Sequence, residues 1–307
     1  MPDHTRNSAG SALPPRAVVS MLFLCLAWGL NLVAIKLGNA GIAPVLQAGL
    51  RSLIAAVLLF GWCRWRGIGF GDWRQDGSLV PGVLAGVLFA VEFTALFIGV
   101  GFTTASRAVV FLYGAPFFVA VGAHWLIPGD QLTGAKAVGL LVAFGGLALA
   151  FAEGLRVPAG DAALLGDALC LVGGGLWGAT TVLVKVSRLR VAPPMLVLLY
   201  QLVVSAPLLL LASLALGEDW RIEPTPVVLG ALLYQGLGIA GISYAVWFAL
   251  VSRHSASRLA AFSVLTPIFG VVAGWALLGE ELGSLFGAAV VLVALGLWLV
   301  NRPAPVG

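Results

Sequence analysis

The feature that most constrains how this chain can fold is a twelve-residue pattern that occurs twice. Residues 105–116 and 256–267 both open with Ala-Ser-Arg, carry Phe four residues after the Arg, and reach Pro nine residues after it. The copies are 256 − 105 = 151 residues apart in a chain of 307. Each copy continues as an apolar segment, and a proline inside an apolar helix removes one backbone hydrogen bond and bends it. Pro116 and Pro267 are therefore predicted to be matched hinges.

A second pair of patterns has almost the same separation. Trp28 is followed by Gly and, eight residues on, by Lys36, whereas Trp177 is followed by Gly and, eight residues on, by Lys185. The offset is 177 − 28 = 149 residues. Together the two patterns indicate an internal duplication whose unit is about half the chain.

Composition places the duplicated unit in a membrane. Hydrophobic residues make up 60% of the chain and charged residues 10%, whereas a soluble domain carries roughly 25% charged residues. The net charge of +4 comes without a basic helix or a long basic run, so no nucleic-acid partner is expected. A membrane span needs roughly 20 apolar residues. Cutting the chain at charges, Gly/Pro clusters and polar turns predicts about ten spans: 17–36, 44–63, 78–102, 105–127, 133–152, 162–186, 194–216, 227–251, 256–278 and 283–301.

Five spans in each half is an odd number, so the second half must enter the membrane from the opposite side. The predicted fold class is an all-α membrane protein of about ten transmembrane helices arranged as two inverted five-helix repeats, as in many secondary transporters. The predicted domains are a disordered cytoplasmic tail (1–16), a first repeat (17–152), a second repeat (162–301) and a cytoplasmic tail (302–307).

The distribution of positive charge predicts the orientation. With the N-terminus inside, twelve Lys and Arg residues fall on the inner side and four on the outer side, a strong asymmetry under the positive-inside rule. Both termini are therefore predicted to be cytoplasmic, in a bacterial-type cytoplasmic (inner) membrane. The inner set is Arg6, Arg16, Arg64, Arg66, Arg74, Lys136, Lys185, Arg188, Arg190, Arg253, Arg258 and Arg302, and the outer set is Lys36, Arg107, Arg156 and Arg221.

These residues resemble a known family. Trp-Gly in the first helix of each half, Arg51 in a Leu-Arg-Ser-Leu-Ile-Ala-Ala second helix, Ala-Ser-Arg…Pro in each fourth helix and Gly-Glu-Glu-Leu at 279–282 are similar to the EamA family of the drug/metabolite transporter superfamily. The resemblance covers roughly residues 17–301. It implies a central cavity lined by the first, third and fourth helices of each half, with the fifth helices outside as scaffold. The family exports amino acids, other metabolites and drugs.

Glu92 is the most informative residue inside a predicted span. It lies about 14 residues into the third span, near the bilayer centre, where a lone carboxylate costs at least about 2.5 kcal/mol and normally faces a cavity or a partner. It is a candidate substrate-amine contact or proton-coupling site. The alternative, a protonated structural carboxyl hydrogen-bonded to a neighbouring helix, stays open.

Further aromatic and polar residues complete a candidate substrate-binding set. Trp28 and Asn31 share a helix face, and the second half repeats this arrangement with Trp177 and two threonines. Such matched faces suit a solute with a flat apolar part, and ordinary aromatic packing is the alternative. The candidate set is Trp28, Asn31, Glu92, Tyr113, Trp177, Thr180, Thr181, Ser243 and Tyr244.

Three arginines in or beside the spans are not included in the candidate substrate-binding set. Arg51 lies about seven residues into the second span, and snorkelling to the outer headgroups or an ion pair explains it. Arg107 and Arg258 lie at helix starts on opposite sides. They are expected to anchor the helices and to contact lipid phosphate.

No catalytic residue, cofactor or metal site is predicted, because Cys25, Cys63 and Cys170 are scattered and the chain has neither His-Glu-x-x-His nor Walker A. The leading hypothesis is a secondary transporter, not an enzyme. It would move a small organic solute (an amino acid, related metabolite or amphipathic drug-like compound) outward by alternating access. The alternative is an integral-membrane enzyme such as a lipid or prenyl transferase. Expected partners are the substrate, membrane lipid and, as candidate coupling ion, protons; the chain is expected to be a monomer or weak dimer.

Overall fold

A computed structural model describes residues 13–67, 76–103, 105–152, 160–278 and 285–302. The predicted tails lie almost entirely outside these residues, as does the turn at 279–282. The first half contains α1 (Pro15–Asn39), α2 (Pro44–Trp65), α3 (Leu79–Phe102), α4 (Ala105–Leu112), α5 (Ala115–Leu126) and α6 (Gly134–Ala150). The second half contains α8 (Asp161–Val186), the 3₁₀ turn η1 (Arg188–Arg190), α9 (Pro194–Ala215), α10 (Pro226–Leu233), the π-helical segment η2 (Tyr234–Ser243), α11 (Tyr244–Arg253), α12 (Ala256–Phe262), α13 (Leu265–Leu278) and α14 (Phe286–Asn301).

The described residues contain six helices that are long and apolar enough to cross a membrane. Four shorter apolar helical segments accompany them: Val110–Leu126, Gly134–Ala150, Ala256–Val272 and Phe286–Asn301. Together they correspond to the ten predicted spans and confirm the predicted fold class. Several of the long helices begin with proline, which suits the first turn of a helix because its missing N–H has no partner there anyway.

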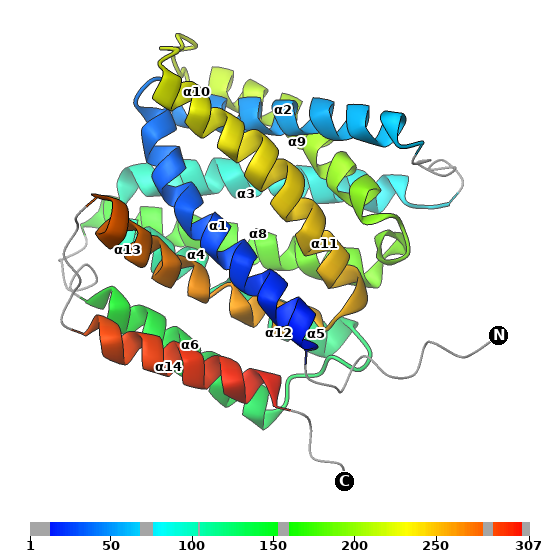
Figure 1. Ribbon diagram of the computed structural model, residues 1–307, viewed down its shortest axis with the longest axis vertical. Helices are drawn as coiled ribbons and strands as arrows, with labels where there is room; N and C mark the ends of the chain where they lie inside the picture. The colour runs from blue at the N-terminus through cyan, green and yellow to red at the C-terminus, as the bar shows by residue number, and fades with distance from the viewer. Residues whose placement is uncertain (1–12, 68–75, 104, 153–159, 279–284, 303–307) are drawn as a thin grey trace.

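The two halves are interleaved rather than placed side by side (Figure 1). The first helix of each half packs against the fourth of the other, α1 on α13 and α8 on α4 and α5. The second helices α2 and α9 pack together, and the fifth helices α6 and α14 form a pair along one edge of the molecule. This reciprocal pattern is what an inverted repeat requires, and it places the fifth helices at the periphery.

Both fourth spans are interrupted rather than bent. In each span one helix ends before the proline and a second helix then begins: α4 ends at Leu112 and α12 ends at Phe262. Pro116 and Pro267 lie in the first turn of α5 and α13, where a backbone N–H has no intrahelical partner. The expectation that each proline removes a bond from a continuous helix is therefore wrong. That these interruptions act as hinges remains a prediction.

The first helix of each half packs against the interruption in the opposite half. In α8, a Cβ added at Gly174 would lie 2.5 Å from the carbonyl oxygen of Leu112, so only glycine allows this approach. In α1, the Sγ of Cys25 donates to the carbonyl oxygen of Phe262 at 3.2 Å. Both interruptions are thus held by a helix that also lines the central cavity described next.

Candidate functional site

A cavity of about 120 Å³ lies between the two halves, near the middle of the bundle. Its wall takes residues from both repeats, including the second helices, which the family resemblance did not place there. The lining residues are Trp28, Asn31, Ile35, Arg51, Phe89, Glu92, Phe93, Leu96, Leu112, Tyr113, Trp177, Thr180, Thr181, Gln201, Ile239, Tyr244, Trp247 and Phe248. Eight of the nine candidate residues belong to this set, and the ninth, Ser243, is bonded to it.

Aromatic rings form much of the cavity wall. The ring of Trp28 meets Trp177 edge-on at a centroid distance of 6.2 Å and Tyr244 at 6.3 Å. Tyr113 meets Trp177 at 5.8 Å, and Phe89 meets Tyr244 at 5.9 Å. Edge-to-face contacts in this range hold aromatic rings in fixed orientations. The wall therefore presents a rigid apolar surface to whatever enters the cavity.

Ser243 lies behind this wall. Its hydroxyl accepts a hydrogen bond from Trp28 Nε1 at 2.9 Å and donates to the carbonyl oxygen of Ile239 at 2.6 Å. Ser243 is the last residue of the π-helical segment η2, and such segments are frequently found at functional sites. The Ser243 hydroxyl therefore orients the Trp28 indole and does not itself line the cavity.

Arg51 is the principal residue that the sequence interpretation missed. Its side chain is 1% exposed and lines the cavity, with the guanidinium carbon 4.0 Å from the centroid of the Phe93 ring. The snorkelling interpretation is therefore wrong, because the side chain points into the protein. The polar groups near it are Tyr244 and Glu92, and none of its three nitrogens makes a well-formed hydrogen bond to a described residue.

Glu92 brings a carboxyl group to the same cavity. Its side chain is 8% exposed, and the electrostatic influence of Arg51 reaches it. A carboxyl and a guanidinium thus line one buried cavity, and the three guanidinium nitrogens have no well-formed hydrogen bond to a described residue. Buried polar groups in a folded protein are nearly always bonded. The guanidinium of Arg51 departs from this pattern, and a carboxyl lines the same cavity.

Two neutral acceptors in the wall also lack partners. Asn31 Oδ1 and Gln201 Oε1 are buried and make no hydrogen bond to a described residue. The hydroxyl protons of Thr180 and Thr181 are already donated to the carbonyl oxygens of Leu176 and Trp177, at 2.9 and 3.0 Å. The threonines consequently offer lone pairs to the cavity, while Arg51 is its main donor.

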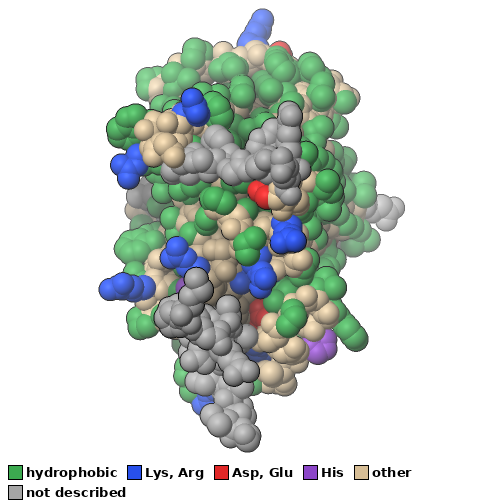
Figure 2. All heavy atoms as spheres, turned by 90° about the vertical axis from the view of Figure 1, so that its right-hand side faces the viewer, with side chains coloured by type: hydrophobic (Ala, Val, Ile, Leu, Met, Phe, Trp, Pro, Cys, Tyr) green, Lys and Arg blue, Asp and Glu red, His purple; other side chains and the backbone are tan. Residues whose placement is uncertain are grey.

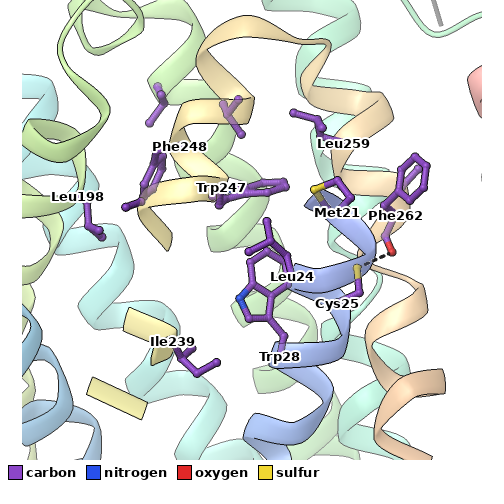
Figure 3. Packing of buried hydrophobic residues seen from close by; sticks show 14 of the residues in the cluster. Met21, Leu24, Cys25, Trp28, Leu198, Ile239, Trp247, Phe248, Leu259 and Phe262 are labelled. Carbon is purple, nitrogen blue, oxygen red and sulfur yellow. Dashed lines mark hydrogen bonds between the residues drawn. The ribbon is translucent and has the colours of Figure 1, made fainter. Parts of the chain in front are cut away.

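The cavity is closed toward the end of the molecule at which α1 begins. On that side Met21 and Leu24 of α1 are buried against Trp247 of α11 and Leu259 of α12 (Figure 3). Toward the opposite end its lining residues, Ile35, Leu96 and Leu112, are partly exposed. In the predicted orientation the closed end is the cytoplasmic one.

Two arginines expected at lipid headgroups have protein partners instead. Arg107 forms an ion pair with Asp167 of α8, whose carboxylate also accepts from Thr103 Oγ1 at 2.7 Å. Arg258 is buried and donates from Nη2 to the carbonyl oxygen of Arg302 at 3.4 Å. Both therefore join helices within the protein.

Metal-ligating side chains do not gather in the part of the chain that the structure describes: no group of three or more His, Cys, Asp or Glu residues is placed to hold an ion. The cysteines at 25, 63 and 170 are buried and free. What distinguishes the centre of the molecule is the aromatic cavity that holds both a guanidinium and a carboxyl.

Comparison with known proteins decides the family. The model of the EamA-like transporter family matches residues 15–152 and 164–302, once for each half. The chain belongs to the EamA-like transporter family. Family membership and the apolar helices make it an integral membrane transporter, and the family resemblance drawn from the sequence is confirmed.

Named relatives and a solved structure agree with the family. A probable amino-acid metabolite efflux pump of Escherichia coli is 26% identical over 92% of this chain and 93% of its own length. The corresponding pump of Salmonella typhimurium is 28% identical over 91% and 92%, and an uncharacterized transporter of Archaeoglobus fulgidus is 26% identical over 90% and 94%. A crystal structure at 18% identity covers 94% of this chain and 99% of its own, with a TM-score of 0.81, and shows the same fold.

Proposed function

We propose that this chain is a secondary transporter that exports a small zwitterionic solute, such as an amino acid or a related metabolite, by alternating access. The observation that carries the proposal is a guanidinium, that of Arg51, and a carboxyl, that of Glu92, in one buried cavity between the repeats. The unpaired donors of Arg51 suit a carboxylate, which guanidinium binds in a fork. The carboxyl of Glu92 suits an ammonium.

The aromatic wall adds a preference for an apolar group on the solute. Trp28, Trp177 and Tyr244 present ring edges and faces around the guanidinium and the carboxyl. A cation beside aromatic faces gains a further attraction. An ammonium between Glu92 and this wall would therefore be stabilised both by the carboxyl group and by the aromatic rings. Amphipathic amines without a carboxylate fit the wall and Glu92 but leave Arg51 unpaired, which makes them the weaker class of substrate.

The interleaved repeats supply the means of transport. We place the substrate at the interface of residues 17–152 and 162–301, and inverted repeats expose such a site alternately to the two sides by rocking. The direction is proposed to be outward, and the printed names of the Escherichia coli and Salmonella typhimurium relatives, both efflux pumps, support it. Both termini are proposed to lie in the cytoplasm, at an inner membrane, on the charge asymmetry.

The test is a counterflow assay in proteoliposomes with a panel of labelled amino acids and amphipathic amines, using the parent protein and Arg51→Gln. Loss of a hydrogen-bonded charge contact costs about 1.5–3 kcal/mol, so amino-acid KM should rise about tenfold or more while amine transport is unchanged. Arg221→Gln, at an exposed loop position, is the matched control. Equal transport of the whole panel by Arg51→Gln would refute zwitterion recognition.

A further inference from the structure

A second and larger cavity lies at the end of the molecule where α3 begins and α8 ends. Its volume is about 900 Å³. Its walls come from α3 and α5 of the first half, and from α8, η1 and the junction of α11 with α12 in the second. The central cavity shares none of these lining residues. In the predicted orientation this end faces the cytoplasm, at the level of the lipid headgroups.

Positive charge dominates the lining of this second cavity. Lys185, Arg188, Arg190 and Arg253 all contribute to its wall. Within the described ranges none of these four side chains forms an ion pair. Figure 2 shows Lys and Arg side chains gathered on this end of the molecule. The four cations come from two separate segments, so the fold, not one basic run of sequence, assembles them.

The acidic and imidazole groups nearby compensate only part of this positive charge. Asp130, in the wall, is bonded to Lys136 Nζ at 2.7 Å and to Ser255 Oγ at 2.7 Å. Asp76, next to the wall, accepts from the backbone N–H of Ser78 at 2.7 Å and attracts Arg188, so it offsets one of the four cations. Burial and the adjacent cations Lys185 and Arg253 lower the pKa of His254. The cavity therefore carries an excess of positive charge.

Apolar side chains continue the basic cavity along the outside of the helices. Val80 and Leu84 of α3, Leu126 of α5 and Val186 of α8 line it and have exposed fractions of 77%, 46%, 58% and 47%. A soluble anion in the basic part would leave this apolar flank bare. A molecule with an anionic head and a hydrocarbon tail would cover both.

We propose that this cavity binds an anionic phospholipid, with its phosphate among Lys185, Arg188 and Arg253 and an acyl chain along the flank of α3 and α5. Basic pockets between transmembrane helices on the cytoplasmic side are suited to anionic headgroups. Lys185 lies in the last turn of α8, the helix that carries Trp177, Thr180 and Thr181 into the central cavity. Lipid binding thus holds the end of a helix shared with the substrate site.

Native mass spectrometry of the purified protein in nonionic detergent tests this site. The protein is titrated with dioleoyl-phosphatidylglycerol, with dioleoyl-phosphatidylcholine and with glycerol 3-phosphate. The parent should bind phosphatidylglycerol at least tenfold more tightly than phosphatidylcholine. Glycerol 3-phosphate should neither bind measurably nor displace bound phosphatidylglycerol. Arg188→Gln with Arg253→Gln should weaken phosphatidylglycerol about tenfold or more, since each cation near an anionic lipid contributes on the order of a factor of five.

The matched control is Arg64→Gln with Arg66→Gln, two exposed cations at the end of α2 that lie outside this cavity. It should leave phosphatidylglycerol affinity unchanged, and because all four arginines are exposed, both double variants should melt like the parent. Equal weakening by the two double variants, equal binding of the two lipids, or displacement by glycerol 3-phosphate would each overturn the lipid site. The assay measures no transport, so its result is independent of the substrate proposed above.

Discussion

Trp28 donates a hydrogen bond from its indole Nε1 to the hydroxyl of Ser243 at 2.9 Å, across 215 residues of sequence. The contact joins the first helix of one repeat to the third helix of the other. It fixes the central tryptophan by means of a residue that does not line the cavity. Orientation of the aromatic wall therefore depends on contact between the halves.

We predict that Ser243→Ala lowers stability in detergent and raises the substrate KM. The substitution leaves the buried Trp28 Nε1 without an acceptor, at a cost of about 1–3 kcal/mol. Thermal unfolding of Ser243→Ala, Trp28→Phe and the double variant measures the coupling, and the double variant should lose less than the sum of the singles. Ser252→Ala is the control, because that hydroxyl is bonded within its own helix to Ala249. If the stability loss of the double variant equalled the sum of the two single losses, the hydrogen bond between Trp28 and Ser243 would contribute nothing to stability.

Gly174→Ala is expected to disturb the contact between α8 and the interruption of the first fourth span. Its Cβ would lie 2.5 Å from a backbone oxygen, which cannot rotate away, and overpacking of this kind costs about 1–3 kcal/mol. Gly175→Ala is the neighbouring control, since its Cβ would come no closer than 3.7 Å to the Phe118 ring. Melting temperature and folded yield should fall for the first variant only. Similar values for both would argue against the close approach.

Replacing Pro116 or Pro267 by Ala is predicted to slow transport more than it lowers folded yield. Each proline lies in the first turn of the helix that follows an interruption, so alanine, which restores a backbone N–H, lets the helix extend backwards and stiffens the proposed hinge. Exchange rates in proteoliposomes, corrected for the amount of folded protein, measure the effect. Unchanged rates in both variants would show that the interruptions are static.

Orientation is tested by single cysteines in a background without the native ones. Arg64→Cys and Arg221→Cys replace exposed arginines that the inverted-repeat prediction places on opposite sides. In intact cells an impermeant maleimide should label position 221 and reach position 64 only after lysis. Labelling of both positions before lysis would contradict the predicted orientation.

Much of the central cavity could be predicted from the sequence because its members are conspicuous in an apolar span. Trp28 and Trp177 lie at matched positions of the duplication, and Glu92 is costly at mid-membrane depth. Each of these signals is local to one helix. The structure adds that their side chains converge, which no single span reveals.

Of the two interpretations of Arg51, snorkelling or an ion pair, only snorkelling is wrong, and its depth in the span could not decide between them. The choice depends on which neighbour covers the helix face, here Phe93 of α3 at 4.0 Å, and sequence spacing within α2 does not contain that information. The lack of a basic counterpart in the second half, where Gln201 lies nearby and lines the same cavity, was the available signal. An unmatched charge in a duplicated fold indicates a specialised site.

The interruptions and the π-helical segment were also beyond sequence analysis. Proline marked the fourth spans, but whether a helix bends or stops depends on the packing of Gly174 and Cys25 against the break. The segment η2 contains Gly236, Gly238 and Gly241, and glycine alone does not distinguish a π-helical turn from a close helix contact. These features arise from contacts between the halves.

The most direct test of the central cavity as the transport site is Glu92→Gln in proteoliposomes, with substrate exchange and pH-gradient-driven flux measured on the same preparation. The substitution keeps the shape of the side chain and removes its charge. Loss of an ammonium contact should weaken both modes together, by about tenfold or more, whereas loss of gradient-driven flux alone would reassign Glu92 to proton coupling. Parent-like rates in both modes, from protein made at the normal level, would contradict the account.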